Sequence, residues 1–196
     1  LPLNGNKEIS FDHIEIISRK SKKRIPISKL NILPKLLKKK ISLDLKNIAS
    51  KKKNFANLNF QKIPNIMGVL NITPDSFSDG GKFNIKNKGL NHAVKMFKSG
   101  ANIIDVGGES TRPGSQAVKV KVEWKRIERT LKLISKKIPT SLDTRKSEIM
   151  EKGIKLGVKV INDISGLRYD AETVNTLKRY KTPFVIQHSQ GTPDNM

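Results

Sequence analysis

Polar side chains that can bind ions or exchange protons follow five short apolar segments in the second part of this 196-residue chain. They are carboxylates, amides and one imidazole: Asn71, Asp105, Asp143, Asn162–Asp163 and Gln187–His188. A carboxylate at the end of a buried segment is costly unless it meets a partner, so a single one is often structural. Five in succession indicate a shared site, because the carboxyl ends of parallel strands meet at one edge.

Two loops on the same edge carry further polar groups. Residues 73–81 read TPDSFSDGG, and residues 107–114 read GGESTRPG. Glycines let backbone N–H groups approach an anion, and an arginine such as Arg112 can hold two phosphate oxygens at once. The second loop therefore predicts binding of a phosphate or a pyrophosphate.

The elements that must position these groups alternate from Pro64 onward. Five apolar segments are separated by amphipathic stretches, and they cover residues 66–70, 102–106, 140–142, 158–161 and 184–186. Continuous apolar character is typical of strands that are buried on both faces. Helical spacing is seen between them, as in Leu90, Ala93, Val94 and Phe97. The pattern predicts a parallel α/β sheet, either doubly wound or closed into a barrel.

Residues 1–62 have a different composition, and we predict that they form a basic N-terminal extension. Apolar residues 13–17 and 24–27 flank a polar turn, which favours a short hairpin, and residues 30–60 favour a helix followed by a linker. The net charge of +22 raises nucleic acid as a partner. However, 31 of the 39 basic residues are Lys, with few aromatic neighbours, which argues against specific nucleic-acid recognition.

Composition also bears on location. No apolar stretch approaches the roughly 18 residues of a membrane span, and the first residues lack the pattern of a signal peptide. The absence of Cys excludes disulfides and thiolate metal sites, and it fits a reducing compartment. We therefore expect a cytoplasmic protein that does not bind membranes.

Two long segments carry a family resemblance. Residues 66–81, IMGVLNITPDSFSDGG, and residues 100–113, GANIIDVGGESTRP, resemble the two signature segments of dihydropteroate synthase over their full length. Shorter matches follow in the same order, at SLDT (141–144), INDI (161–164) and HSQGTP (188–193). The resemblance implies an α/β fold of the (β/α)8 TIM-barrel type.

The resemblance covers about residues 64–196. We expect residues 63–196 to form a pterin-binding barrel that is incomplete at its C-terminal end, truncated after about the fifth strand. A complete barrel has eight βα units in about 250 residues. We therefore expect the complete protein to be the enzyme and this segment alone to be inactive.

The family's reaction joins p-aminobenzoate to 6-hydroxymethyl-7,8-dihydropterin pyrophosphate, which gives 7,8-dihydropteroate and pyrophosphate in folate biosynthesis. The implied cofactor is Mg²⁺, a hard ion that keeps several waters and bridges phosphate oxygens, so the amide oxygen of Asn71 suffices as a protein ligand. The resemblance implies that Thr111 and Arg112 hold the pyrophosphate.

The other roles also come from the matched segments. Asp143 and Asn162 would contact the pterin ring, and Asp105 would lie beside the cation that develops on it. Phe77 and Pro113 would form the walls of the aminobenzoate pocket as the two loops close, and Asp79 would order that closure.

Several alternatives stay open at this point. A methyltransferase that uses methyltetrahydrofolate shares the Asp and Asn strand ends, but it should lack both polar loops because it handles no pyrophosphate. A basic nucleic-acid-binding module in residues 1–62 is an alternative of another class, and its binding would fall steeply with salt. The same segment could instead plug the bottom of the barrel or form a dimer contact, and a homodimer of the complete protein stays open.

Overall fold

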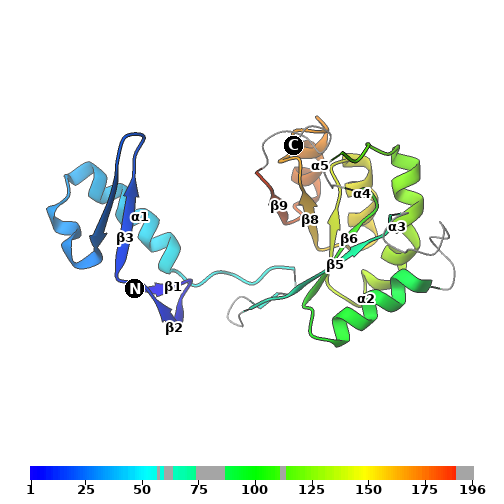
Figure 1. Ribbon diagram of the computed structural model, residues 1–196, viewed down its shortest axis with the longest axis horizontal. Coiled ribbons are helices and arrows are strands. Elements are labelled where there is room, and N and C mark those ends of the chain that lie inside the picture. The colour runs from blue at the N-terminus through cyan, green and yellow to red at the C-terminus, as the bar shows by residue number, and fades with distance from the viewer. Residues whose placement is uncertain (57, 60–63, 74–86, 111–113, 189–196) are drawn as a thin grey trace. The chain divides into compact units, whose positions relative to one another are not determined.

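The computed structural model describes residues 1–196 except 57, 60–63, 74–86, 111–113 and 189–196 (Figure 1). The chain forms two compact units, Leu1–Asn54 and Phe55–Met196. The domain boundary expected between residues 62 and 63 stays a prediction, because residues 60–63 lie outside the described part.

The first unit combines two small antiparallel sheets with one long helix. Its elements are β1 (Pro2–Leu3), β2 (Asn6–Ser10), β3 (His13–Ile17), β4 (Lys22–Pro26), the 3-10 helix η1 (Ile27–Ile32) and α1 (Lys35–Ala49). β1 pairs with β2, and β3 pairs with β4 so that Ile14 lies opposite Ile25. Ile25, Ile41 and Leu45 are buried, so α1 contributes one apolar face to a small core.

The second unit is a five-stranded parallel sheet with helices between the strands. Its elements are β5 (Met67–Asn71), α2 (Lys88–Lys98), β6 (Ile103–Gly107), α3 (Val120–Ile134), β7 (Thr140–Asp143), α4 (Ser147–Lys155), β8 (Val160–Asp163), α5 (Thr173–Tyr180) and β9 (Phe184–Ile186). The strands lie in the order β5-β6-β7-β8-β9, and every neighbouring pair is parallel.

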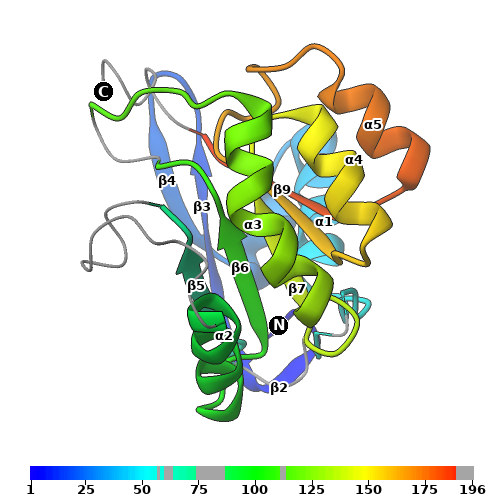
Figure 2. The same ribbon diagram turned by 90° about the vertical axis from the view of Figure 1, so that its right-hand side faces the viewer.

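The strand order distinguishes the two α/β folds that the sequence leaves open. A doubly wound sheet reverses its strand order and carries helices on both faces. Here each strand pairs with the next one along the chain, and α2 to α5 lie along one face of the sheet (Figures 1 and 2). This arrangement is part of a (β/α)8 barrel, and the predicted fold class is confirmed.

The core lies between the sheet and these helices. Fully buried side chains from strands and helices meet there, among them Leu70, Ile104, Leu142 and Ile161 from the sheet and Ile127, Leu131 and Ile149 from the helices. All five residues of β6 are buried, because that strand has a neighbour on each side and helices over it.

The expectation that all five strands are buried on both faces is wrong for β5 and β9. Met67 and Val69 of β5 are exposed, and so are all three residues of β9. Both are edge strands of the described sheet, so each has only one paired neighbour. On the more central strands β6 and β8, Ile103 and Val160 are instead buried against Leu58. In the described part of the chain, no helix is long and apolar enough to cross a membrane.

Two leucines of α3 provide a matched test of this core. Leu131 is fully buried, whereas Leu133 is 41% exposed on the same helix. Leu131→Ala removes buried methyl groups and leaves a cavity, so we expect it to lower the free energy of unfolding by about 2–5 kcal/mol. Leu133→Ala should change it by less than about 1 kcal/mol. Urea unfolding measures both, and equal losses for the two variants would contradict the described packing.

Candidate functional site

The pairing of the strands places the predicted site residues on one face of the sheet. Asn71 lies opposite Gly107, Gly107 lies opposite Asp143, and Asp143 lies opposite Asn162. Asp105 is two residues before Gly107, so its side chain projects from the same face, because side chains in a strand alternate between faces. The face is the one opposite the helices, since the intervening residues Leu70, Val106, Leu142 and Ile161 pack into the helix-covered core. The structure therefore brings the four residues together at the carboxyl ends of β5 to β8.

Gly107 leaves open the space between two of these side chains. A Cβ atom at this position would lie 3.1 Å from Asn71 Oδ1 and 3.3 Å from Asp143 Oδ2. An amide oxygen and a carboxylate oxygen from two different strands thus approach the same point. Both are hard oxygen donors, and Asn71 is exposed, so a cation or a hydrogen-bond donor can reach them.

Asp105 lies at the floor of the site and keeps one oxygen for a further partner. The residue is 5% exposed, and its Oδ2 accepts a hydrogen bond of 3.0 Å from Asn162 Nδ2. Its Oδ1 is buried and has no hydrogen-bond partner among the described residues. A buried carboxylate oxygen without a partner is costly, and an N–H group of a ligand would satisfy it.

The neighbouring Asp163 has a structural role. It is fully buried, and it accepts hydrogen bonds from the backbone N–H groups of Ser165 and Leu167, at 2.8 and 3.0 Å. These bonds hold the turn that follows β8. Of the predicted pair Asn162–Asp163, only Asn162 therefore reaches the site face.

The two site carboxylates have raised pKa values. Burial, together with the charges of Asp105 and Glu123, raises the pKa of Asp143 to about 7. Burial also raises the pKa of Asp105, although the Ser141 hydroxyl and the hydrogen bond from Asn162 act in the opposite direction. Neighbouring carboxylates with perturbed pKa values are typical of functional sites. Asp143 can exchange a proton near neutral pH, and both side chains can accept hydrogen bonds from N–H groups of a ligand.

Gln187 and His188 follow β9 and are exposed. Five further predicted site residues cannot be placed. Phe77, Asp79, Thr111, Arg112 and Pro113 all lie outside the described residues. Their expected roles therefore stay predictions.

Sequence reasoning missed a charged cluster directly beside the site. Glu109, Glu123 and Lys146 are buried together, and Arg145 joins them. One signal was available, since Glu123 lies within the amphipathic segment that forms α3 at a position that faces the core. A carboxylate there predicts a buried cation, although the sequence does not say which one.

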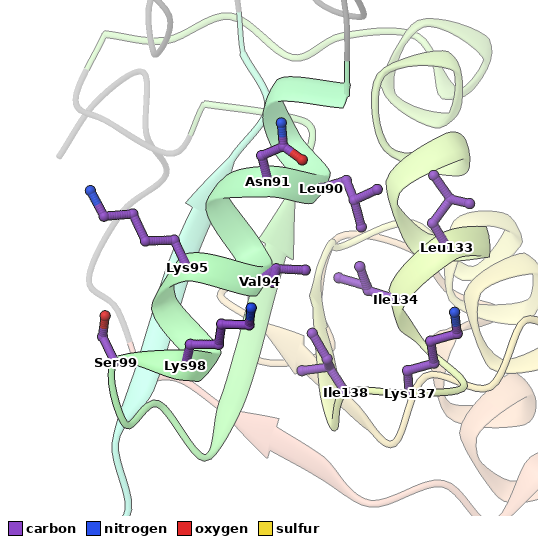
Figure 3. A pocket seen from close by; sticks show the side chains of 10 residues that line it. All are labelled: Leu90, Asn91, Val94, Lys95, Lys98, Ser99, Leu133, Ile134, Lys137 and Ile138. Atoms are coloured by element: carbon purple, nitrogen blue, oxygen red, sulfur yellow. The ribbon is translucent and has the colours of Figure 1, made fainter.

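A separate pocket of about 600 Å³ lies between α2 and α3. Leu90 and Val94 face Leu133 and Ile134 across it, and none of the strand-end residues lines it (Figure 3). Lys95 points away from the pocket (Figure 3). This pocket is therefore not part of the strand-end site.

The raised pKa of Asp143 predicts an unusual effect on stability. Between about pH 4 and pH 7 the unfolded chain has lost this proton while the folded protein retains it, so stability falls as the pH rises through this range. Asp143→Asn removes the penalty. We expect this variant to unfold at a temperature at least about 2 °C higher than the parent protein near pH 8, with a smaller difference near pH 4.

Asp170→Asn is the control, because its expected change in unfolding temperature has the opposite sign. Burial acts to raise the pKa of Asp170, but the N–H groups of Ser147 and Glu172 hydrogen-bond to it and lower the pKa overall. This variant should therefore unfold at a lower temperature near pH 8. Thermal unfolding at the two pH values measures both effects. A destabilised Asp143→Asn variant at both pH values would contradict the described site.

Comparisons with known proteins agree with this geometry. The family described as pterin binding enzyme matches residues 67–196. The dihydropteroate synthase of Bacillus subtilis is 40% identical over 135 residues, which are 68% of this chain and 47% of that protein. The chain thus spans about half the length of the curated relatives that it matches.

Solved structures are similar over the same region. The dihydropteroate synthase of Xanthomonas albilineans with 4-aminobenzoic acid has a TM-score of 0.61 at 36% identity, and the match covers 65% of this chain and 47% of that one. The Burkholderia cenocepacia enzyme complexed with 7,8-dihydropteroate has a TM-score of 0.59 at 31% identity, with 69% and 45% covered. With its parallel barrel strands and the acidic and amide side chains at their carboxyl ends, this chain belongs to the pterin-binding enzyme family.

Proposed function

We propose that the complete protein is a dihydropteroate synthase, a transferase that joins p-aminobenzoate to 6-hydroxymethyl-7,8-dihydropterin pyrophosphate. The curated Bacillus subtilis relative bears this name, and solved relatives hold 4-aminobenzoic acid or 7,8-dihydropteroate. The observation that carries the proposal is the buried, unpartnered oxygen of Asp105 on a face that it shares with Asp143 and Asn162.

These three side chains match the chemistry of a dihydropterin ring. The ring presents N–H groups at its edge, and buried carboxylate and amide oxygens are suitable acceptors for them. Asp143 and Asn162 would bind that edge, and the negative charge of Asp105 would stabilise positive charge that develops on the ring. Because Asp105 is buried, water is partly excluded around it and the electrostatic effect is stronger than in bulk solvent.

The reaction exchanges one bond for another. The C–O bond between the methylene carbon of the pterin and the pyrophosphate breaks, and its electron pair leaves with the pyrophosphate. The amine of p-aminobenzoate forms a C–N bond to the same carbon and then loses a proton. Thr111 and Arg112 are proposed to hold the leaving pyrophosphate. In the same proposal, Phe77 and Pro113 form the walls of the aminobenzoate pocket, and Asp79 orders the closure of the loops over it.

Asn71 fits the role of a ligand to Mg²⁺. Asn71 is exposed, and its amide oxygen borders the open space that Gly107 leaves. Mg²⁺ commonly takes one or two protein oxygens, substrate phosphate oxygens and several waters. When bound, the ion would neutralise charge that builds up on the pyrophosphate oxygens. Asn71 would orient the pyrophosphate at the end of β5, next to Asp143.

The proposal also covers the location and the oligomeric state of the complete protein and the choice between two reactions. We place the complete protein in the cytoplasm, and we leave open whether it forms a homodimer. The alternative of a methyltransferase that uses methyltetrahydrofolate has less support, because the relatives at about 40% identity carry the synthase name.

The direct test uses the complete protein. It is incubated with p-aminobenzoate, the dihydropterin pyrophosphate and Mg²⁺, and chromatography measures the dihydropteroate that forms. We expect turnover that stops when the metal is chelated. Absence of dihydropteroate with both substrates and metal present would overturn the proposed function.

A variant pair tests the metal ligand separately. Asn71→Ala should raise the Mg²⁺ concentration needed for half-maximal rate by at least about tenfold, because a direct oxygen ligand is lost. Asn91→Ala, on the exposed surface of α2, is the matched control and should leave this concentration unchanged. An unchanged magnesium requirement in Asn71→Ala would remove Asn71 from the proposed metal site.

A further inference from the structure

Lys146 is buried between two glutamates from different elements. Its Nζ donates to Glu109 Oε2, and to Glu123 Oε2 at 2.5 Å. The side chains of Lys146 and Glu109 are each 6% exposed, and that of Glu123 is fully buried. A buried ion pair is held tightly once formed, because removal of one partner leaves an uncompensated charge in a low-dielectric interior. The three side chains therefore behave as one unit.

The two residues before Lys146 bind the same glutamates. Thr144 Oγ1 donates to Glu123 Oε1 at 2.7 Å, and Arg145 Nη2 donates to Glu109 Oε1 at 2.5 Å. Three consecutive residues after β7 thus attach to one glutamate that follows β6 and to one glutamate on α3. We call Glu109, Glu123, Thr144, Arg145 and Lys146 the glutamate clamp.

The glutamate clamp also reaches the segment that follows β8. The guanidinium of Arg145 lies 4.0 Å from the centre of the Tyr169 ring, which is a cation–π contact. In addition, the backbone N–H of Thr144 donates to the carbonyl oxygen of Asn162 at 3.1 Å. The clamp therefore links the chain just beyond three neighbouring strands.

The glutamate clamp is close in sequence to the two site carboxylates. Glu109 is four residues after Asp105, and Lys146 is three residues after Asp143. Asp105 and Asp143 are like charges when both are ionised, and the charge of Asp105 is one cause of the raised pKa of Asp143. Their repulsion favours separation of the two strand ends, while the attraction of Lys146 and Arg145 for Glu109 opposes it.

The two glutamates of the clamp differ in the direction of their pKa shifts. Burial acts to raise the pKa of Glu109, but hydrogen bonds from Lys146 and Arg145 lower it overall, so Glu109 is anionic. Burial raises the pKa of Glu123, and the bonds from Lys146 and Thr144 counteract this effect. Glu109 and Glu123 lie in ion pairs with Arg145 and Lys146, so loss of Lys146 would leave two acidic side chains with one basic side chain.

We propose that Lys146 is a positioning residue for the pterin subsite: by binding Glu109 and Glu123 together, it holds the ends of β6 and β7 at the spacing at which Asp105 and Asp143 receive the ring. Lys146 itself touches no substrate. The choice of the pterin as the ligand rests on the proposed function, whereas the clamp rests on the ion pairs alone.

Two variants of the complete protein separate positioning from stability. Lys146→Met leaves Glu109 and Glu123 in excess, so we expect both a lower unfolding temperature and a higher KM for the pterin substrate, by roughly tenfold, with little change in KM for p-aminobenzoate. The double variant Lys146→Met, Glu123→Gln restores the charge balance but not the bridge. We expect it to recover most of the unfolding temperature and to keep the raised KM.

A surface lysine provides the matched control. Lys155 pairs with Glu151 on the exposed side of α4, with side chains 61% and 30% exposed. Lys155→Met should change neither the KM values nor, beyond about 2 °C, the unfolding temperature. The proposal is overturned if Lys146→Met has the parent KM for the pterin substrate, or if the double variant recovers this KM together with its stability.

A readout that needs no substrate distinguishes failure of this proposal from failure of the proposed function. The Thr144 amide is hydrogen-bonded to Asn162, and its hydrogen exchange reports whether the segment after β7 that carries the three clamp residues Thr144, Arg145 and Lys146 stays in place. We expect exchange in the double variant to be roughly tenfold faster than in the parent protein. If the parent protein makes no dihydropteroate, the proposed function fails, and this exchange still decides the clamp: an unchanged rate overturns it.

Discussion

The candidate site depends on the register in which four neighbouring parallel strands pair. Hydrogen bonding aligns Asn71, Gly107, Asp143 and Asn162 in a row, and the alternation of side chains adds Asp105 to the same face. Each strand contributes only one or two polar side chains. Convergence therefore comes from the sheet, not from any single loop, and the apolar residues between them lock each strand to the helices.

This arrangement has an energetic cost that the rest of the unit offsets. Burial of Asp105 and Asp143 raises the pKa of both, which means that the fold holds them in an environment that disfavours their charge. A core of aliphatic side chains on the opposite face stabilises the strands that carry them. The neighbouring ion pairs of Lys146 add a local attraction where the two carboxylates repel each other.

The sequence is sufficient to predict the strands, their parallel arrangement and the edge at which Asn71, Asp105, Asp143 and Asn162 meet. The prediction is possible because continuous apolar segments mark buried strands. The polar residue that ends each of these segments then lies at the carboxyl end of the strand. The sequence could not predict the exposure of β5 and β9, which depends on what covers a strand and not on its own residues. It also could not pair Lys146 with its glutamates, which lie 37 and 23 residues away, since local periodicity carries no information about partners at that distance.

The adjacent residues Asn162 and Asp163 serve opposite sides of the same strand. Asn162 lies on the face that carries the candidate site, and Asp163 accepts the hydrogen bonds that hold the following turn. A shift of β8 by a single residue would exchange their places, bringing a hydrophobic residue or the wrong carboxylate to the ligand side. Loss or gain of one codon within this strand would thus damage both recognition and folding, whereas many single replacements on the outer helices would leave both intact.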